Sequence, residues 1–364
     1  MEKIRVLVAD DSAFMRKLVQ EILLTSGRIE IVGTARNGED AVEKTKRLKP
    51  DVVTMDIEMP GINGIAALKK IMRESPVPMV MLSSTTTEGA ENTFLAIQNG
   101  AVDFIAKPSG TISLDLEKIS DEIINKVLAA SKVNISRLSA IHDGKNLFST
   151  NNQKSSKIEL HALSMKHKET SWEISAKKII CIGTSTGGPR ALKAVLSKLP
   201  AAIAAPILIV QHMPAGFTKS LASRLNSLSK LTVKEAEDGE VLVNGTAYIA
   251  PGGYHLKVKK IGDSLAVDLD QSSIRNGLRP SVDLMFESVS QIQGVAKIAV
   301  IMTGMGTDGM QGLIHLHQSG KLKAIAESEE TSIVFGMPKA AISTHLIDEV
   351  QNVDDIAETI LKYV

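Results

Sequence analysis

Short apolar runs alternate with amphipathic stretches over residues 1–130. Five runs have the length and composition of buried strands: Ile4 to Val8, Ile29 to Ala35, Val52 to Met55, Met79 to Leu82, and Asp103 to Ile105. Apolar residues between these runs recur at helical spacing, as Phe14, Leu18, Val19, Ile22 and Leu23 do. Strands that alternate with helices form right-handed βαβ units, so this region predicts a parallel sheet covered on both faces.

A second α/β pattern begins at Lys177. Its strand-like runs are Ile179 to Ile182, Ile207 to Val210, Ala247 to Ile249, Leu265 to Leu269, Ile298 to Met302, and Lys323 to Ala326. Helix-like stretches lie between several of them, for example Ala191 to Leu199 and Val282 to Val289. We therefore expect a second α/β domain, doubly wound around a mostly parallel sheet.

Apolar residues show no sustained helical or strand periodicity between Ser131 and Ala176, where Ser, Asn, Lys and His are frequent. This composition is typical of a linker. A small helical insert around Ile158 to Met165 is the alternative. The predicted organisation is a domain over residues 1–130, a linker over 131–176 and a domain over 177–364.

Composition narrows the class of protein. Of the 364 residues, 43% are apolar and 23% are charged, as in ordinary globular proteins. The 42 basic and 41 acidic side chains nearly cancel, so no overall field favours nucleic acid or an anionic membrane. The single cysteine, Cys181, cannot form an internal disulfide. No signal peptide is recognisable, and no apolar run approaches the roughly 20 residues that span a bilayer. We expect a cytoplasmic protein that neither enters a membrane nor binds nucleic acid.

Three carboxylates are predicted to meet at one edge of the first sheet. Asp10 and Asp11 follow the first strand, and Asp56 follows the third. The carboxyl ends of parallel strands converge on one crevice, and three carboxylates there suit a hard cation such as Mg²⁺. Ser83 ends the fourth strand and Lys107 follows the fifth. One aspartate alone would indicate only an exposed loop residue, but the whole set indicates a ligand site.

Residues 3–126 resemble the receiver domain of two-component response regulators. The matching positions are Asp10-Asp11, residues 56–61 (DIEMPG), Ser83, and Lys107-Pro108. The resemblance implies a flavodoxin-like fold with five parallel strands. It also implies that Asp56 accepts a phosphoryl group from a histidine kinase.

The same resemblance assigns roles to the residues around Asp56. Mg²⁺ would be bound by Asp10, Asp11 and Asp56. Ser83 and Lys107 would contact the phosphate. Phe104 stands where the family's switching aromatic residue is found.

A glycine-rich turn with a central serine, residues 183–188 (GTSTGG), follows the first apolar run of the second domain. Such a strand-to-helix turn presents a nucleophilic serine, or it cradles a phosphate. The phosphate alternative is the weaker one, because this turn has no G-x-G-x-x-G, no Lys-Ser/Thr ending and no acidic residue at the ribose-binding spacing. Arg190 could contact an anion, but one arginine is little support.

A nucleophile at Ser185 needs a base and a group that orients the base. His212 directly follows the apolar run that ends at Gln211, so it also lies at a strand end. Asp308 lies in a glycine-rich loop after a third strand, where close backbone N–H groups could form an oxyanion hole. A surface histidine and a plain glycine-rich turn are the alternatives. Spacing alone also leaves open the pair Asp308 and His315.

The second domain resembles the CheB methylesterase family over essentially all of residues 177–364. The matching stretches are residues 182–188 (IGTSTGG), 211–214 (QHMP), 235–240 (EAEDGE), 247–252 (AYIAPG), 279–283 (RPSVD), 302–306 (MTGMG) and 334–338 (VFGMP). Small departures are Thr184 and Thr307. The resemblance implies that Ser185 is the nucleophile, His212 the base and then the acid, and Asp308 the orienting acid. Met305 and Thr186 would stabilise the oxyanion, and no cofactor would be needed.

The two resemblances together imply an esterase controlled by phosphorylation. It would hydrolyse glutamate methyl esters on chemoreceptors, release methanol and deamidate receptor glutamines. Its partners would be chemoreceptors and the chemotaxis histidine kinase, and the chain would act as a monomer. The unphosphorylated receiver would cover the catalytic crevice. One alternative is a receiver-controlled binding protein without activity, and another is service in a different chemosensory pathway.

Overall fold

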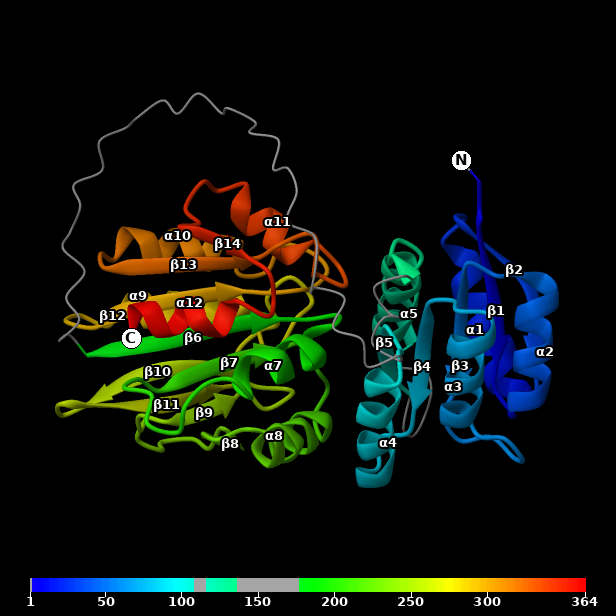
Figure 1. Ribbon diagram of the computed structural model, residues 1–364, viewed down its shortest axis with the longest axis horizontal. Helices are drawn as coiled ribbons and strands as arrows, with labels where there is room; N and C mark the ends of the chain where they lie inside the picture. The colour runs from blue at the N-terminus through cyan, green and yellow to red at the C-terminus, as the bar shows by residue number, and fades with distance from the viewer. Residues whose placement is uncertain (1, 108–115, 136–176) are drawn as a thin grey trace, which may run out of the picture.

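The computed structural model describes residues 2–107, 116–135 and 177–364, which form two α/β domains that lie side by side (Figure 1). The proposed helical insert at 158–165 and most of the predicted linker lie outside the described residues. No helix among the described residues is long and apolar enough to cross a membrane.

The N-terminal domain is a five-stranded parallel sheet in the order β2-β1-β3-β4-β5, with helices on both faces. The prediction of this sheet is confirmed. Its elements are β1 (Ile4–Ala9), α1 (Ala13–Thr25), β2 (Ile29–Ala35), α2 (Gly38–Leu48), β3 (Val52–Asp56), α3 (Gly64–Glu74), β4 (Met79–Ser83), α4 (Thr87–Gln98), β5 (Asp103–Ala106) and α5 (Leu116–Ala130). Polar side chains cap the first four helices, and Ser12 accepts from the N–H of Met15 as its position predicts.

The C-terminal domain is a seven-stranded sheet in the order β14-β13-β12-β6-β7-β9-β8. All six neighbouring pairs are parallel. Its strands are β6 (Lys178–Thr184), β7 (Ile207–Gln211), β8 (Thr232–Glu235), β9 (Thr246–Ile249), β12 (Ala296–Ile301), β13 (Leu322–Glu327) and β14 (Glu349–Gln351). β10 (His255–Ile261) and β11 (Ser264–Asp270) form a separate antiparallel hairpin. The expected strand over Leu265 to Leu269 therefore belongs to this hairpin and not to the main sheet.

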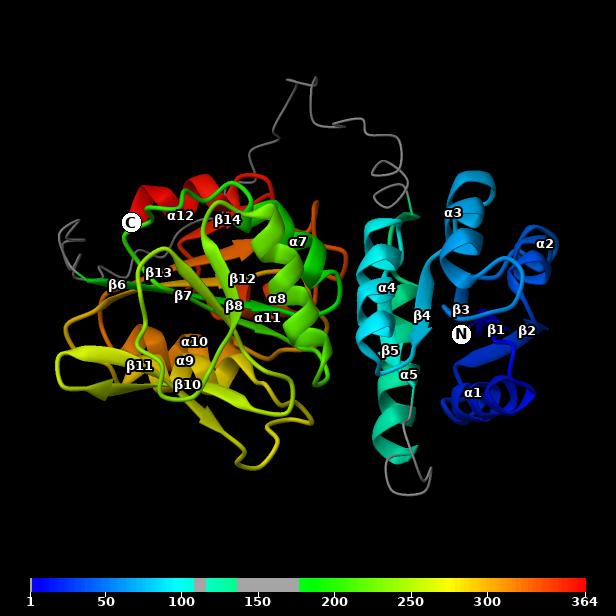
Figure 2. The same cartoon turned by 90° about the horizontal axis from the view of Figure 1, so that it is seen from below.

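Helices cover both faces of the seven-stranded sheet (Figure 2). They are α7 (Gly188–Leu196), α8 (Phe217–Leu228), α9 (Val282–Ser290), α10 (Met310–Gln318), α11 (Met337–Ile342) and α12 (Ile356–Tyr363). The chain leaves β6 toward β7 on one side and returns to β12 on its other side. The strand ends around β6 thus form a topological switch point, the position where open α/β sheets bind ligands.

The two domains meet along helix α4 of the first and helices α7 and α8 of the second (Figures 1 and 2). Phe104 of β5 packs against Phe217, the first residue of α8, with ring centroids 4.7 Å apart. Arg190 of α7 donates from Nη2 to the carbonyl oxygen of Ile97, near the end of α4, at 3.0 Å. The receiver therefore faces the edge of the second sheet where the switch point lies.

Candidate active site

Ser185 lies in a tight turn between β6 and α7. Gly187 adopts φ +80°, which favours glycine, and a Cβ on Gly188 would lie 1.9 Å from Oε1 of Gln211. The N–H of Ser185 donates to the carbonyl of Thr303 at 3.0 Å, and its own carbonyl accepts from Gly188 at 2.7 Å. These bonds hold a partly exposed serine at the end of a fully buried strand.

Gln211 ties the serine turn to the end of the neighbouring strand, β7. Its Nε2 donates to the carbonyl oxygens of Ser185 at 3.0 Å and His212 at 3.2 Å. Its Oε1 accepts from the hydroxyl of Thr184 at 2.7 Å. The N–H of His212 also donates to the carbonyl of Thr184 at 3.1 Å. The turn and the histidine are therefore fixed against each other through side-chain and backbone bonds.

His212 pairs with Asp308. The distance from Nε2 of His212 to Oδ2 of Asp308 is 2.8 Å. His315, the alternative partner, lies on α10 and faces Glu287, with Nδ1 3.6 Å from Oε1. The bond to Asp308 engages Nε2, so Nδ1 is the ring nitrogen left for proton transfer. No hydrogen bond between Oγ of Ser185 and this ring is formed among the described residues.

The carboxylate of Asp308 is buried and accepts several further hydrogen bonds. The donors are the hydroxyl of Ser281 at 2.9 Å and the N–H groups of Val282 at 2.7 Å and Asp283 at 3.0 Å. Burial alone would raise the pKa of Asp308, but the bonds from His212 and from these backbone groups hold it below its usual range. The acid is therefore ionised and fixed in orientation beside the histidine.

The glycine-rich loop after β12 lies directly against the serine turn. The hydroxyl of Thr303 donates to the carbonyl of Thr186 at 2.9 Å. A Cβ on Gly304 would lie 2.8 Å from Cβ of Ser185, so only glycine allows this approach. Met305 is exposed, and none of the hydrogen bonds among the described residues uses its N–H group.

The receiver reaches Thr186, the residue that follows Ser185. The hydroxyl of Thr186 donates to Oδ2 of Asp103, the first residue of β5, at 2.5 Å. Asp103 also accepts from the N–H of Phe104 at 2.7 Å and pairs with Lys126 at 3.5 Å. Thr186 is buried under this contact. One hydrogen bond thus connects the receiver sheet to the serine turn.

Asp10, Asp11 and Asp56 lie together at the edge of the receiver sheet, with carboxylate oxygens within 4.8 Å of one another. Lys107 Nζ lies 2.7 Å from Oδ2 of Asp56 and 3.2 Å from Oδ2 of Asp10. Burial raises the pKa of Asp56 to about 6 and also raises the pKa of Asp10. Oδ2 of each is buried, and Lys107 is its ion-pair partner among the described residues. These oxygens fit a hard divalent cation.

Ser83 and Phe104 point away from this pocket. The hydroxyl of Ser83 donates to the carbonyl of Gly89 at 2.9 Å and accepts from Thr93 at 2.8 Å, both in α4. Phe104 is buried against Phe217, and Lys126 Nζ lies 5.0 Å from its ring centre. In this structure Ser83 therefore contacts α4 of the receiver, and Phe104 contacts α8 of the second domain.

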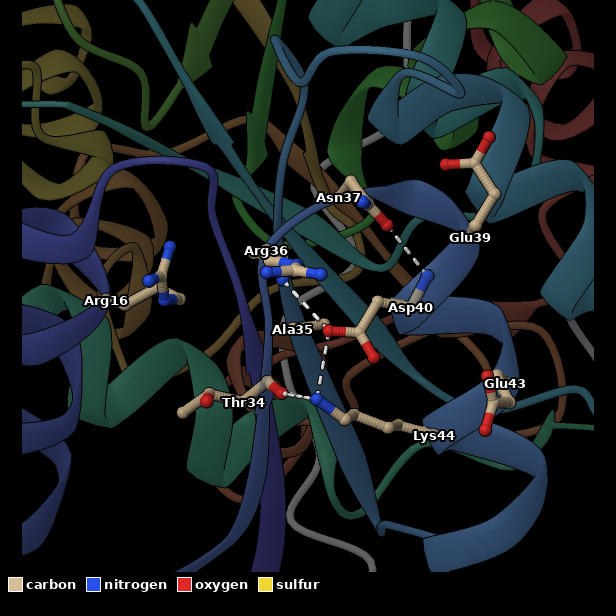
Figure 3. Close-up of a pocket in the computed structure, with 9 residues that line it drawn as sticks. All are labelled: Arg16, Thr34, Ala35, Arg36, Asn37, Glu39, Asp40, Glu43 and Lys44. Carbon is tan, nitrogen blue, oxygen red and sulfur yellow. Dashed lines mark hydrogen bonds and ion pairs between the residues drawn. The ribbon is translucent and has the colours of Figure 1, made fainter.

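A hollow of about 520 Å³ lies between α1, β2 and α2, beside the acidic pocket (Figure 3). Arg16 on its wall donates to the carbonyl oxygens of Asp10 and Asp11 at 2.7 and 2.9 Å. On the opposite wall Lys44 pairs with Asp40 at 2.9 Å and donates to the carbonyl of Thr34. The hollow is therefore lined by charges of both signs and contains none of the catalytic candidates.

Some residues that build the site carried no signal by themselves in the sequence. Hydrogen bonds that hold a catalytic candidate in place come from Gln211, Ser281, Asp283 and Thr303. Each lies within a stretch that resembles the family, but the type of residue does not show which distant group it contacts. Only the fold brings their partners near.

Two family models match the chain. The CheB methylesterase model matches residues 180–360, and the response regulator receiver domain model matches residues 6–117. A protein-glutamate methylesterase/protein-glutamine glutaminase of Geobacillus kaustophilus (strain HTA426) is 53% identical, and the match covers 100% of this chain and 99% of the relative. The protein with the same description from Bacillus subtilis (strain 168) is 47% identical over 98% of this chain and 97% of its own.

A solved structure agrees with the fold of the second domain. The catalytic domain of the Thermotoga maritima CheB methylesterase is 47% identical, with a TM-score of 0.51, and the match covers 52% of this chain and 100% of that one. The full-length relatives and both family models indicate the same organisation, a receiver domain followed by a methylesterase domain. The chain therefore belongs to the CheB family of methylesterases that carry an N-terminal response regulator receiver domain.

Proposed function

We propose that this chain is a serine esterase activated by phosphorylation of its receiver. Its substrates would be glutamate methyl esters on chemoreceptors, which it hydrolyses to glutamate and methanol, and receptor glutamines, which it deamidates. The observation that carries the proposal is the bond between His212 and Asp308, at 2.8 Å, beside a serine turn fixed to the histidine through Gln211.

Ser185, His212 and Asp308 divide the chemistry among them. The hydroxyl oxygen of Ser185 attacks the ester carbonyl while Nδ1 of His212 takes its proton. The tetrahedral intermediate collapses, and the imidazolium returns the proton to the departing methanol. Water then attacks the acyl-enzyme by the same route and frees the glutamate and Ser185. With an amide substrate, ammonia leaves in place of methanol. Asp308 orients the ring and stabilises its charged form.

Backbone N–H groups of Met305 and Thr186 would stabilise the oxyanion. The close contact between Gly304 and Ser185 brings the loop next to the reacting oxygen. Preorganised donors at this position commonly contribute about 3–4 kcal/mol to transition-state stabilisation. The exposed side chain of Met305 would contact the substrate.

The receiver would control access to Ser185. Its β5 contacts Thr186 through Asp103, and Phe104 packs on α8. A receptor helix cannot occupy the same space as these groups, so the domains must separate before hydrolysis. Phosphorylation of Asp56 by a histidine kinase would change the pairing of Lys107 and the position of Ser83, and through α4 and β5 it would loosen this contact.

Asp10, Asp11 and Asp56 would hold Mg²⁺, which neutralises charge on an incoming phosphoryl group when bound. We place the domain limits at 1–130 and 177–364, supported by the end of α5 at Ala130 and the start of β6 at Lys178. The protein would act as a monomer in the cytoplasm, where receptor signalling regions and the kinase are available.

Methanol release from a methylated chemoreceptor tests the proposed activity. Wild type, treated with a small-molecule phosphodonor, should release methanol, and Ser185→Ala should lower kcat by something on the order of 10⁶, because triad members act as a unit. Unchanged release by Ser185→Ala would refute the assignment of the nucleophile. Receptor binding without methanol release by wild type would favour the inactive binding protein.

A further inference from the structure

Helices α9 and α10 exchange caps at their N-termini. Asp308, two residues before the first residue of α10, accepts from the N–H groups of Val282 and Asp283 at the start of α9. In return Oδ1 of Asp283 accepts from the N–H groups of Gly309 at 2.9 Å and Gly312 at 2.7 Å, at the start of α10. Each aspartate therefore satisfies two backbone donors of the other helix, which its negative charge also favours.

The two helices are in close contact next to these caps. A Cβ on Gly312 would lie 2.8 Å from the carbonyl oxygen of Asp283 and 2.6 Å from Cβ of Phe286. Asp283 is 1% exposed, so its carboxylate has no supply of water to replace these two bonds. The position of the first turn of α10, and with it the position of Asp308, is set against α9.

The start of α9 also touches the strand that carries the nucleophile. A Cβ on Gly183, in β6, would lie 2.6 Å from Cγ1 of Val282, and one on Gly309 would lie 3.0 Å from the same atom. Val282 thus packs under both the serine turn and the loop of Asp308. A shift of α9 would move the acid relative to Ser185 and His212.

We infer that Asp283 is a positioning residue for the esterase reaction: its carboxylate caps α10 and thereby fixes the triad acid Asp308 beside His212. The inference rests on the proposed function. Asp283 touches no substrate and no reacting atom, so it is not a catalytic residue. It acts through the backbone of α10 and through its negative charge.

The effect of the negative charge of Asp283 can be measured because other titratable groups lie near it. Burial first, and the neighbouring Asp308 second, raise the pKa of Asp283. On its own helix it faces Glu287, which pairs with Arg275 at 3.0 Å and with His315 of α10 at 3.6 Å. The other titratable group of the cluster is His212, bound to Asp308. Toward β6, α9 presents the uncharged side chain of Val282.

Two variants separate the cap from the charge. Asp283→Ala removes the acceptor, so kcat for methanol release should fall about 10- to 100-fold, while KM changes less than about twofold because no substrate contact is lost. Asp283→Asn keeps an acceptor oxygen and removes the charge. It should recover most of the kcat lost by the alanine variant. It should also move the acidic limb of the kcat/KM profile to lower pH by a few tenths of a unit, because a charge that stabilises the imidazolium is gone.

Two control variants accompany them. Asp348→Ala removes a carboxylate of the same domain that accepts from the N–H of Ala324 at 2.8 Å and pairs with Lys323, and kcat should be unchanged. His315→Gln removes an exposed titratable group near Glu287, and the acidic limb should stay in place. All assays use the full chain with a small-molecule phosphodonor, and circular dichroism verifies that each variant is folded.

The outcomes distinguish this inference from the proposed function. Wild type without methanol release refutes the proposed function itself. A folded Asp283→Ala with wild-type kcat, in an assay where wild type is active and Ser185→Ala is not, refutes only the role of Asp283. If the alanine variant does not fold, Asp283→Asn decides the question: an acidic limb identical to that of wild type overturns the inference.

Discussion

Glu327 is a buried acid that lies behind the catalytic loop, at the end of β13. Its Oε2 accepts from the N–H of Thr303 at 2.7 Å, and its Oε1 accepts from the hydroxyl of Thr331 at 3.0 Å. Burial raises the pKa of Glu327 to about 7. Thr303 in turn accepts from the N–H of Ser185. A titrating group therefore supports the loop that holds Ser185.

This acid predicts a pH-dependent stability. Between about pH 4.5 and 7 the folded protein keeps a proton on Glu327 that the unfolded chain releases, so the free energy of unfolding falls as pH rises. Glu327→Gln cannot titrate, so its stability relative to wild type should improve from pH 5 to pH 8, by up to about 3 kcal/mol. Urea unfolding of both proteins at the two pH values measures the difference.

Glu349→Gln is the matched control for this experiment. Bonds from Lys362 and Tyr363 hold the pKa of Glu349 at about 2, so its titration lies below the tested window. Glu349→Gln should therefore change the free energy of unfolding relative to wild type by the same amount at pH 5 and pH 8. If the difference in the free energy of unfolding between Glu327→Gln and wild type is also the same at both pH values, Glu327 does not titrate between them.

At the scale of single residues, the sequence pointed to the candidate catalytic groups and did not show which groups hold them. Ser185, His212 and Asp308 stand at strand ends within recognisable stretches, so topology alone predicts that they converge. Asp283 also lies in such a stretch, but its residue type does not show which group it contacts, and Glu327 lies outside all of these stretches. Their partners are backbone N–H groups of other elements, and a hydrogen bond to a distant backbone group leaves no pattern in the sequence.

At the scale of elements, Asp103 at the start of β5 forms the hydrogen bond between the receiver sheet and the serine turn. Its bond to Thr186 joins a hydroxyl to a carboxylate, a type that contributes about 1.5–3 kcal/mol. Asp103→Ala removes it and should raise the methanol release of the unphosphorylated full chain roughly tenfold, because the closed state is weakened. Steady-state rates without phosphodonor measure the change.

Asp40→Ala provides the comparison, since it removes a receiver carboxylate that pairs with Lys44 far from the domain contact. It should leave the basal rate unchanged. An Asp103→Ala rate equal to that of wild type would show that the bond to Thr186 does not restrain the site.

The pattern of apolar residues predicted the central strands well and the peripheral ones poorly. Receiver strands β1, β3, β4 and β5 and the core strands β6, β7, β12 and β13 are fully or largely buried, which gives continuous apolar runs. Strands β8 and β14 lie at the two edges of the second sheet and are short and polar. β10 alternates apolar and lysine residues and pairs only with β11. Edge strands need fewer apolar residues, so their signal is weak.

At the scale of the whole molecule, the contact between domains is specific but incompletely packed. A hollow of about 640 Å³ separates parts of α4 and α8, with Phe94 and Leu95 on one wall and Lys219 and Arg224 on the other. Contacts between domains of one chain generally resemble transient interfaces. The sequence predicted both folds and their order, but not this contact, because it depends on the shapes of two folded surfaces.

The most direct test of the account is methanol release from methylated receptor by the full chain, with and without a small-molecule phosphodonor and Mg²⁺, in wild type and Asp56→Asn. We expect the phosphodonor to raise the wild-type rate by on the order of tenfold or more, within the usual range of coupling between sites. Asp56→Asn lacks the carboxylate that would accept the phosphoryl group, so its rate should stay at the basal level. Equal stimulation of both proteins, or a wild-type rate that does not respond to the phosphodonor, would contradict control of Ser185 by phosphorylation of Asp56.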